Sequence, residues 1–130
     1  MPSVLIVDDD DRTAVALGAR LKAGGFEPVL AYDVPTAVTL AAAHQPSLVI
    51  LDIAMPQGGG FALAQRLRRM PATASTPILF ITASRHPGLM EHAMERGAAG
   101  YIEKPYDPRE LLALVRDLLT GQEEGNAAQQ

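Results

Sequence analysis

The stretch that decides the fold is Val4-Leu5-Ile6-Val7-Asp8-Asp9-Asp10-Asp11, in which four apolar residues are followed directly by four acids. The apolar run is rich in β-branched residues and shows no polar alternation, which is typical of a strand that is buried on both faces. Such strands occur in parallel sheets that helices cover on both sides. The stretch therefore predicts a buried parallel strand that ends at an acidic edge.

Further strands and helices alternate along the rest of the chain. The other strand candidates are the apolar runs at residues 48–51 and 78–81 and the weaker ones at 28–32 and 100–102. Apolar residues follow helical spacing within residues 14–21, 37–41, 63–67, 89–93 and 111–118. Five strands in strict alternation with five helices predict an α/β fold with a doubly wound parallel sheet.

Capping residues stand where these helices should begin and end. Asp10 and Asp11 are expected to cap the first helix and to favour its dipole, and therefore not to bind a ligand. The other expected N-caps are Asp33 and Asp107, and the expected helix stops are Gly24-Gly25, Gly97 and Gly121. Residues 1–120 are therefore predicted to form one domain, and residues 121–130 a polar tail or the start of a linker.

Composition limits the classes of function that fit. The chain has 130 residues, 48% of them hydrophobic, and a net charge of −4, which favours one folded domain and argues against binding to a nucleic-acid backbone. It has no cysteine, so disulfides and thiolate zinc sites are excluded. No apolar run approaches the ~18 residues of a membrane span. The acids at Asp8 interrupt any signal peptide, and we expect a cytoplasmic location.

Polar residues follow four of the predicted strands. Asp8 and Asp9 follow the first, Asp52 the third, Thr82 the fourth and Lys104 the fifth. Ligands of such sheets bind beyond the carboxyl ends of the strands, so these side chains should converge there. Crowded carboxylates need a cation, and an oxygen-only ligand set suits Mg²⁺. A carboxylate nucleophile with an ammonium and a hydroxyl nearby suits phosphoryl transfer.

Four motifs in order make the chain resemble the receiver domains of bacterial two-component response regulators. They are Leu5-Ile6-Val7-Asp8-Asp9-Asp10, Asp52-Ile53-Ala54-Met55-Pro56 with Gly60 after it, Ile81-Thr82-Ala83, and the run from Gly97 to Tyr106 that contains Lys104-Pro105. Each motif alone is weak, but the four in order and at this spacing are specific. The resemblance covers residues 4–119 and implies a flavodoxin-like sheet of strand order 2-1-3-4-5.

The resemblance also implies a role for each matching residue. Asp52 would be the phosphoacceptor, and Thr82 and Lys104 would contact the phosphoryl group. Mg²⁺ would be held by Asp52, by Asp9 directly, by Asp8 through water and by the backbone carbonyl of Ala54. The Lys104–Pro105 peptide, which precedes Pro105, would be cis. Tyr101 would be the aromatic switch residue, which turns inward when Thr82 moves toward the phosphoryl group.

The predicted function is a phosphorylation-dependent signalling switch, which catalyses only its own phosphorylation and dephosphorylation and is not a metabolic enzyme. A histidine kinase or His-containing phosphotransfer protein would supply the phosphoryl group. The fourth helix, fifth strand and fifth helix would then bind a second copy or an effector. We expect no membrane contact and no direct contact with nucleic acid by this domain.

Other interpretations remain open at this point. A Mg²⁺-dependent phosphohydrolase would need a second acid two residues after its nucleophile, and Ala54 occupies that position. A non-phosphorylated interaction module would be favoured by an incomplete site. A dinucleotide-binding function is disfavoured because acids, and no Gly-rich turn, follow the first strand.

The glycines at 58–60 lack the residues of a P-loop and are expected to form a flexible loop near the site. His86 and His92 are expected to be exposed and to bind no metal.

Two small residues bear on the lifetime of the phosphorylated state. In the family, the side chains two residues after the phosphoacceptor and two after the conserved threonine lie near the path of the hydrolytic water. Here these residues are Ala54 and Ser84, and neither carries a carboxamide or carboxylate that could hold a water in line. The resemblance therefore implies slow spontaneous loss of the phosphoryl group.

Overall fold

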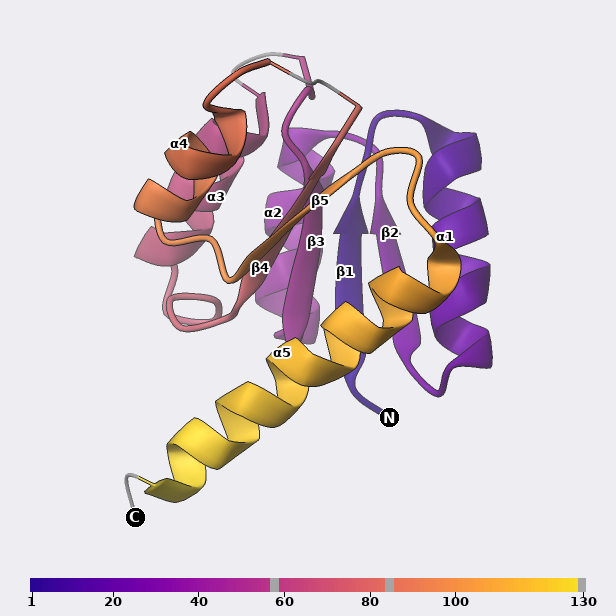
Figure 1. Cartoon of the computed structure of the whole chain (residues 1–130). Coiled ribbons are helices and arrows are strands. Elements are labelled where there is room, and N and C mark those ends of the chain that lie inside the picture. Colours follow the sequence, from indigo (N-terminus) through magenta and orange to yellow (C-terminus); the bar gives the residue numbers. More distant parts are fainter. Residues whose placement is uncertain (57–58, 84–85, 129–130) are drawn as a thin grey trace.

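A five-stranded parallel sheet of order β2-β1-β3-β4-β5 forms the centre of the protein (Figure 1). The computed structural model describes residues 1–56, 59–83 and 86–128. The strands are β1 (Ser3–Val7), β2 (Glu27–Ala31), β3 (Leu48–Asp52), β4 (Ile78–Thr82) and β5 (Gly100–Glu103). The helices are α1 (Asp11–Ala23), α2 (Val34–His44), α3 (Gly59–Arg69), α4 (Leu89–Glu95) and α5 (Pro108–Ala128). The predicted fold class and the strand order are both confirmed.

Both faces of the sheet are covered, which explains the unbroken apolar runs. Alternate strand residues point to opposite faces, so Ile6 packs under α1 and α5 whereas Leu5 packs under α2 and α3. The α1/α5 face contains Ile50 and Ile81, and the opposite face contains Phe80. Figure 1 shows α1 and α5 on one side of the sheet and α2, α3 and α4 on the other. A polar residue in the middle of these strands would lose its water on either side, so the central strands are apolar up to the polar residues at their carboxyl ends.

The helix starts agree with the capping predictions. The side chain of Asp10 accepts hydrogen bonds from the backbone N–H groups of Arg12 (3.1 Å) and Thr13 (3.3 Å), so Asp10 is the N-cap of α1. Asp11 is the first residue of that helix. Asp33 caps α2 in the same way, with Thr36 N at 2.8 Å. The cap at Asp10 also directs the chain away from the acidic edge, which leaves Asp8 and Asp9 there.

Several boundaries differ from the predictions. The strand expected at residues 28–32 lies one residue earlier, at Glu27–Ala31, and β1 begins one residue earlier, at Ser3. Three strands extend one residue further than expected, namely β3 to Asp52, β4 to Thr82 and β5 to Glu103. The stop predicted at Gly121 is wrong, because α5 continues to Ala128. Gly121 costs about 1 kcal/mol relative to alanine inside a helix, and good helix formers such as glutamate and alanine follow it. The division into residues 1–120 and 121–130 stays a prediction.

The glycines expected to form a loop are partly helical. Gly59 and Gly60 are the first two residues of α3, so the loop prediction is wrong for them, and Gly58 lies outside the described residues. The reason is steric, because Gly60 packs directly against the backbone at the end of β3. Among the residues that the structure describes, no helix has the length and apolar character needed to cross a lipid bilayer.

Candidate functional site

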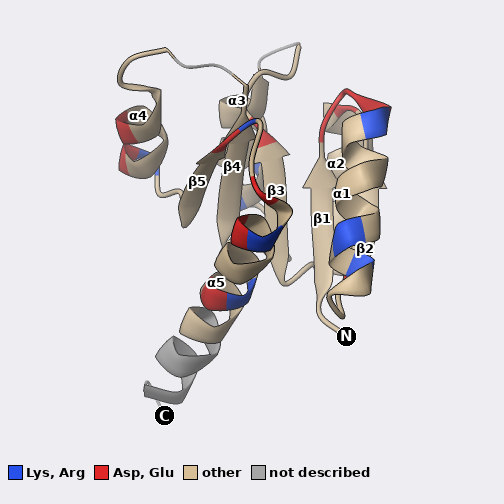
Figure 2. Ribbon diagram, turned by 45° about the vertical axis from the view of Figure 1, so that its right-hand side comes forward, with Lys and Arg blue, Asp and Glu red and all other residues tan. Residues whose placement is uncertain are grey.

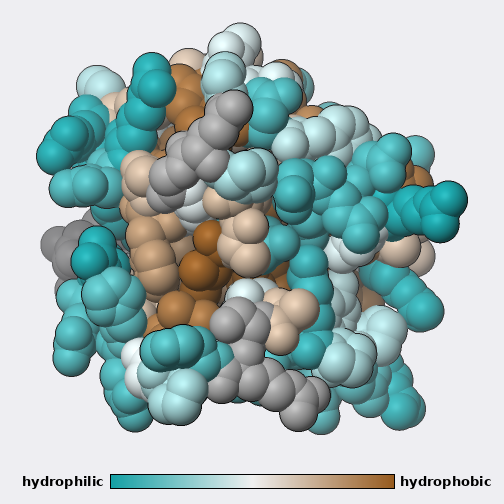
Figure 3. Space-filling model, turned by 90° about the horizontal axis from the view of Figure 1, so that it is seen from above, coloured by the Kyte–Doolittle hydropathy of each residue, from teal (hydrophilic) through white to brown (hydrophobic). Residues whose placement is uncertain are grey.

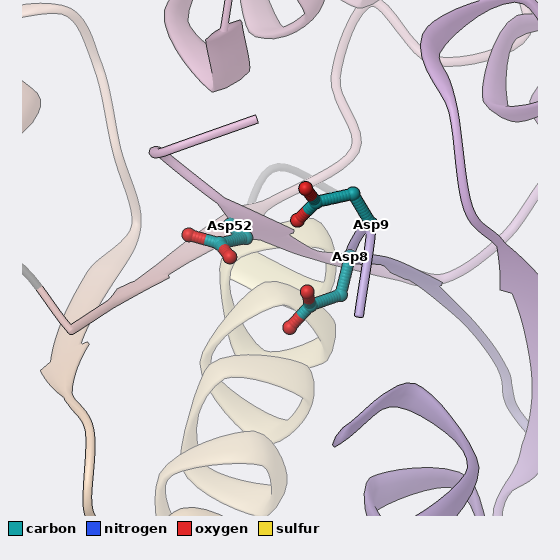
Figure 4. A group of neighbouring side chains, drawn as sticks. All are labelled: Asp8, Asp9 and Asp52. Carbon is teal, nitrogen blue, oxygen red and sulfur yellow. The ribbon is translucent and has the colours of Figure 1, made fainter. Parts of the chain in front are cut away.

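Three carboxylates converge where β1 and β3 end. Asp8, Asp9 and Asp52 each offer one oxygen atom, and these atoms all lie within 4.8 Å of one another (Figure 4). The parallel register pairs Val7 with Leu51, so the next residues, Asp8 and Asp52, stand side by side. Asp8 and Asp52 are buried and Asp9 is exposed. The sequence predicted this convergence from the positions of the strand ends.

Short local hydrogen bonds orient the two buried acids. Asp8 Oδ1 accepts a hydrogen bond from Asp10 N at 2.9 Å, and Asp52 Oδ1 accepts one from Ala54 N at 3.0 Å. In both cases a carboxylate bonds to the backbone two residues further on, which is a common way for aspartate to begin a turn. Each acid therefore keeps Oδ2 directed toward the shared site.

Lys104 joins the two buried acids. Its Nζ donates to Asp8 Oδ2 at 2.8 Å and to Asp52 Oδ2 at 3.3 Å, across sequence separations of 96 and 52 residues. Its backbone N–H donates to Thr82 O at 2.8 Å, which fixes the chain beyond β5 against the end of β4. The Lys104–Pro105 peptide is cis, as the resemblance implied. The ammonium thus sits over the carboxylates and not in solvent.

The electrostatic balance of the site leaves room for a cation. Burial raises the pKa of Asp52 above its ordinary value, and the negative charge of Asp8 raises it further, against the lowering effects of Ala54 N–H and Lys104. Burial alone would lower the pKa of Lys104, but its hydrogen bond to Asp8 and the charge of Asp52 outweigh burial and raise it. Three carboxylates face one ammonium here, and their oxygen-only donor set fits Mg²⁺.

Thr82 and Tyr101 lie on the α2–α4 face of the sheet, opposite to the α1/α5 face from which Asp8 and Asp52 project. Thr82 is fully buried at the end of β4, two residues after Phe80, and so shares the α2–α4 face with it. Tyr101 of β5 is half-buried, pairs with Phe80 in register and belongs to the same apolar cluster. Burial raises the pKa of the Tyr101 hydroxyl, with a smaller contribution from Glu103. Thr82 thus ends a strand between the acids and Tyr101.

The roles expected of Ala54 and Ser84 stay predictions. The side chain of Ala54 is exposed, and its backbone N–H is committed to Asp52. The role of its carbonyl as a metal ligand stays a prediction. Ser84 lies outside the described residues. His86 and His92 are exposed, as predicted, and neither belongs to the metal-competent cluster found among the described residues.

Gly60 is a residue whose role the sequence did not reveal. Its backbone N–H donates to Ile53 O at 2.9 Å, which seats the first turn of α3 against the end of β3. A Cβ atom at this position would lie 2.5 Å from Asp52 O and 2.8 Å from Ile53 Cα, so only glycine fits. Gly60 belongs to the motif that begins at Asp52, but the sequence gives no physical reason for a glycine at that position. Nothing in the local pattern could have supplied that reason, because the contact depends on how α3 meets β3.

Charged residues and hydrophobic atoms lie next to each other at the carboxyl edge of the sheet. Figure 2 shows acidic residues where β1 and β5 end, together with a basic residue just beyond β5. Figure 3 looks down on this edge and shows a hollow of hydrophobic atoms surrounded by hydrophilic residues. The site therefore lies at a polar edge that borders the apolar interior.

Comparisons with known proteins agree with this geometry. A family model described as the response regulator receiver domain matches residues 4–116. The chain is 38% identical over 119 residues to the DNA-binding dual master transcriptional regulator RpaA of Synechocystis sp.. It is 36% identical over 115 residues to the response regulator PleD of Caulobacter vibrioides. These matches cover 92% and 88% of this chain but only 49% and 25% of the relatives, so the chain spans at most about half their length.

Solved structures of similar proteins have the same fold. The chemotaxis protein CheY4 of Vibrio cholerae superposes with a TM-score of 0.84 at 29% identity, over 91% of this chain and 98% of that one. A two-component response regulator from Clostridium difficile gives a TM-score of 0.84 at 26% identity, over 92% and 97% of the two chains. The similarity therefore covers nearly the whole of each comparison chain.

Proposed function

The chain belongs to the response regulator receiver domain family, and from that premise we propose that Asp52 is the residue that accepts its phosphoryl group. Receiver domains of two-component systems are phosphorylation-dependent signalling switches, and this chain is one of them. The assignment to Asp52 rests on one observation: Asp52 is buried, ends the central strand β3, lies beside Asp8 and Asp9 and pairs with Lys104.

The chemistry follows from the carboxylate and its neighbours. An oxygen of Asp52 attacks phosphorus and forms an O–P bond, while the N–P bond of a phosphohistidine, or the O–P bond of a small donor, breaks and its electron pair leaves with the donor. Lys104, already 3.3 Å from Asp52 Oδ2, neutralises the phosphoryl oxygens, and the Thr82 hydroxyl donates to one of them. Dephosphorylation at the same acyl phosphate resets the switch.

The same acids provide a site for Mg²⁺. Asp9 and Asp52 would hold the ion directly, with Asp8 and the carbonyl of Ala54 completing the protein's contribution. When bound, Mg²⁺ supplies positive charge that offsets the carboxylates and the transferred group. The protein's own part is to keep Asp8 and Asp52 pointing inward, through their bonds to Asp10 N and Ala54 N.

Transmission of the signal depends on Thr82 and Tyr101. When Thr82 turns toward the phosphoryl group, it vacates space on the α2–α4 face, and Tyr101 can move into that space. The change would repack the surface formed by α4, β5 and α5. A second copy or an effector would bind there, and a histidine kinase or His-phosphotransfer protein would supply the phosphoryl group.

Phosphorylation with a small donor tests the assignment. Incubation with acetyl phosphate and Mg²⁺ should add a single phosphoryl group, about 80 Da by intact mass. Asp52→Asn should abolish the addition, because the amide is not a nucleophile toward phosphorus. Asp11→Asn is the matched control, since Asp11 is an exposed acid of the same acidic run, and it should be phosphorylated like the unmodified protein.

Two results would contradict the proposal. A persistent mass increase in the Asp52→Asn variant would place the modification on another residue. Continuous release of phosphate from many donor molecules, without a stable phosphoprotein, would favour a phosphohydrolase. The alanine at position 54 argues against that outcome, because it leaves no second acid there to protonate a leaving group.

A further inference from the structure

A cavity lies between α3 and residues 96–98, which follow α4, away from the acidic edge, and is called the α3–α4 cavity. It has a volume of about 220 Å³, and its apolar wall is formed by Phe61, Ile78 and Phe80, with Ala64 and Ala98 beside them. Its wall includes residues from the start of β4, the end opposite to the acids. For comparison, an engineered apolar cavity of about 150 Å³ admits one benzene molecule. The α3–α4 cavity therefore has room for an aromatic body.

Two arginines give this cavity a positive charge. Arg68 is half-buried, and its Nη1 donates to the backbone carbonyls of Ala74 and Thr76. Because it is half-buried, this guanidinium has lost part of its hydration, and the burial lowers its pKa. Arg96 reaches over the ring of Phe61, with its Cζ 5.3 Å from the ring centroid. Its Nε donates to His92 Nε2 at 2.9 Å, which leaves the remaining donors of its guanidinium for another acceptor.

The lining carries no charge of opposite sign. Among the described residues that form the wall, none is acidic, and Gln65 is the other polar side chain. Arg68 and Arg96 also form no salt bridge in the described part of the chain. Two guanidiniums beside an apolar pocket, without a carboxylate of the protein, are suited to an anion with an apolar body.

We propose that the α3–α4 cavity binds a small aromatic carboxylate, with its ring against Phe61 and Phe80 and its carboxylate at Arg68 and Arg96. The volume suits one ring or two fused rings. A neutral aromatic molecule would contact the apolar wall but leave the two guanidiniums without an anionic partner. The charge of the ligand should therefore contribute much of the affinity.

The cavity shares its sheet face with the switch residues, although the binding proposal does not depend on phosphorylation. Phe80 lines the cavity, pairs in register with Tyr101 and precedes Thr82 by two residues. Because α3 and the turn that follows α4 form its opposite walls, a bound ligand would contact both of them.

Direct titration of the unphosphorylated protein tests the proposal. Indole-3-carboxylate is a suitable probe, because the protein has no tryptophan and therefore no indole fluorescence of its own. The carboxylate should bind saturably and at least about tenfold more tightly than indole-3-carboxamide, which has the same shape without the charge. Backbone amide shifts in NMR spectra should concentrate in α3, α4 and β4.

Variants locate the bound probe. Ala64→Leu should fill the cavity and weaken binding at least about tenfold, whereas Ala62→Leu, on the exposed side of the same helix, should not change it. Arg96→Gln alters an exposed side chain, so the fold should persist, and it should weaken binding of the carboxylate about tenfold but not of the carboxamide.

Several outcomes would overturn the proposal. Absence of saturation up to about 10 mM would mean that no useful affinity exists. Equal affinities for carboxylate and carboxamide would remove the role of the arginines. Unchanged binding in both Ala64→Leu and Arg96→Gln would place the probe elsewhere. None of these measurements uses a phosphodonor, so their failure would leave the assignment of Asp52 untouched.

Discussion

The two faces of the sheet differ in what they deliver to the carboxyl edge. On the α1/α5 face, strand alternation directs the buried acids Asp8 and Asp52 inward, and Lys104 pairs with both. On the α2–α4 face, Thr82 follows Phe80 and lies in the strand next to Tyr101. The first face contributes charge, and the second contributes one buried hydroxyl and apolar packing.

Under the proposed function, this difference separates the chemical event from its readout. The acids and the ammonium would bind the cation and the phosphoryl group, beside helices that pack on the sheet through apolar residues. Thr82 and Tyr101, the proposed readout residues, hold no charge, so they would respond by repacking. The two meet in the backbone at the edge, where Ile53 N donates to Ile81 O (3.0 Å) and Lys104 N donates to Thr82 O (2.8 Å). We therefore expect substitutions on one face to affect chemistry and substitutions on the other to affect transmission.

The largest expected effect is on Mg²⁺ binding to the charged face. Asp9→Asn should weaken Mg²⁺ binding about a hundredfold, since it removes a charged ligand from a cluster of three acids. Asp11→Asn, with the same change in net charge, should alter the affinity less than about twofold because its charge is exposed and screened. Isothermal titration calorimetry would measure both affinities. Equal losses in the two variants would mean that the cluster at Asp8, Asp9 and Asp52 is not the site.

The next prediction separates the faces directly. Thr82→Ala should still accept a phosphoryl group from acetyl phosphate, at a rate reduced by roughly tenfold to a hundredfold, since one hydrogen bond to a charged phosphoryl oxygen is lost. The NMR shifts that phosphorylation causes at Tyr101 and in α4 should disappear. If those shifts persist in the phosphorylated Thr82→Ala protein, the hydroxyl does not transmit the signal. Shifts confined to α1 and α2 in the unmodified protein would contradict the readout face itself.

A smaller effect is expected where α3 meets β3. Gly60→Ala should lower the free energy of unfolding by about 1–3 kcal/mol, because its Cβ would lie 2.5 Å from Asp52 O and a backbone must shift. Gly121→Ala is the control, since a Cβ there meets nothing within 4 Å and alanine favours a helix. Urea unfolding would compare the two. The prediction fails if Gly60→Ala is as stable as Gly121→Ala.

The pKa of Asp52 leads to a prediction about stability in which the size of the effect depends on pH. Burial raises this pKa, so the protonated form is the one that folding favours, and its stabilising contribution is lost as pH rises through the raised value. At pH 7 the buried charge therefore destabilises the fold, and Asp52→Asn should raise the melting temperature in metal-free buffer. The gain should shrink as pH falls toward about 4, and it should be lost below about 3, where aspartate is protonated in both the folded and the unfolded state. A gain that is the same at pH 4 and pH 7 would show that charge is not its cause.

The sequence predicted the fold well because its strands are unbroken apolar runs and its helices have apolar residues at helical spacing. Runs such as Leu48–Asp52 have no polar residue before their end, which is typical of a strand covered on both faces. The acids, Thr82 and Lys104 follow from the same argument, because parallel strands end at one edge. The pairing of Lys104 with Asp8 could not be predicted, since it depends on where the chain goes after β5. The role of Gly60 and the α3–α4 cavity likewise depend on how whole elements pack, which no local pattern records.

The smallest expected effect concerns the lifetime of the phosphorylated protein. Ala54 follows Asp52 by two residues, and its exposed side chain has no polar atom that could place a water behind phosphorus. Ala54→Asn should therefore shorten the lifetime about threefold to tenfold, a modest part of what correct positioning of a reactant contributes. Ala54→Leu is the control, because it adds a side chain of similar size without a carboxamide. The measurement is phosphate release after removal of donor, in excess Mg²⁺. A lifetime that is unchanged or longer in Ala54→Asn, or equally short in Ala54→Leu, would show that position 54 controls access of water to the site and does not orient it.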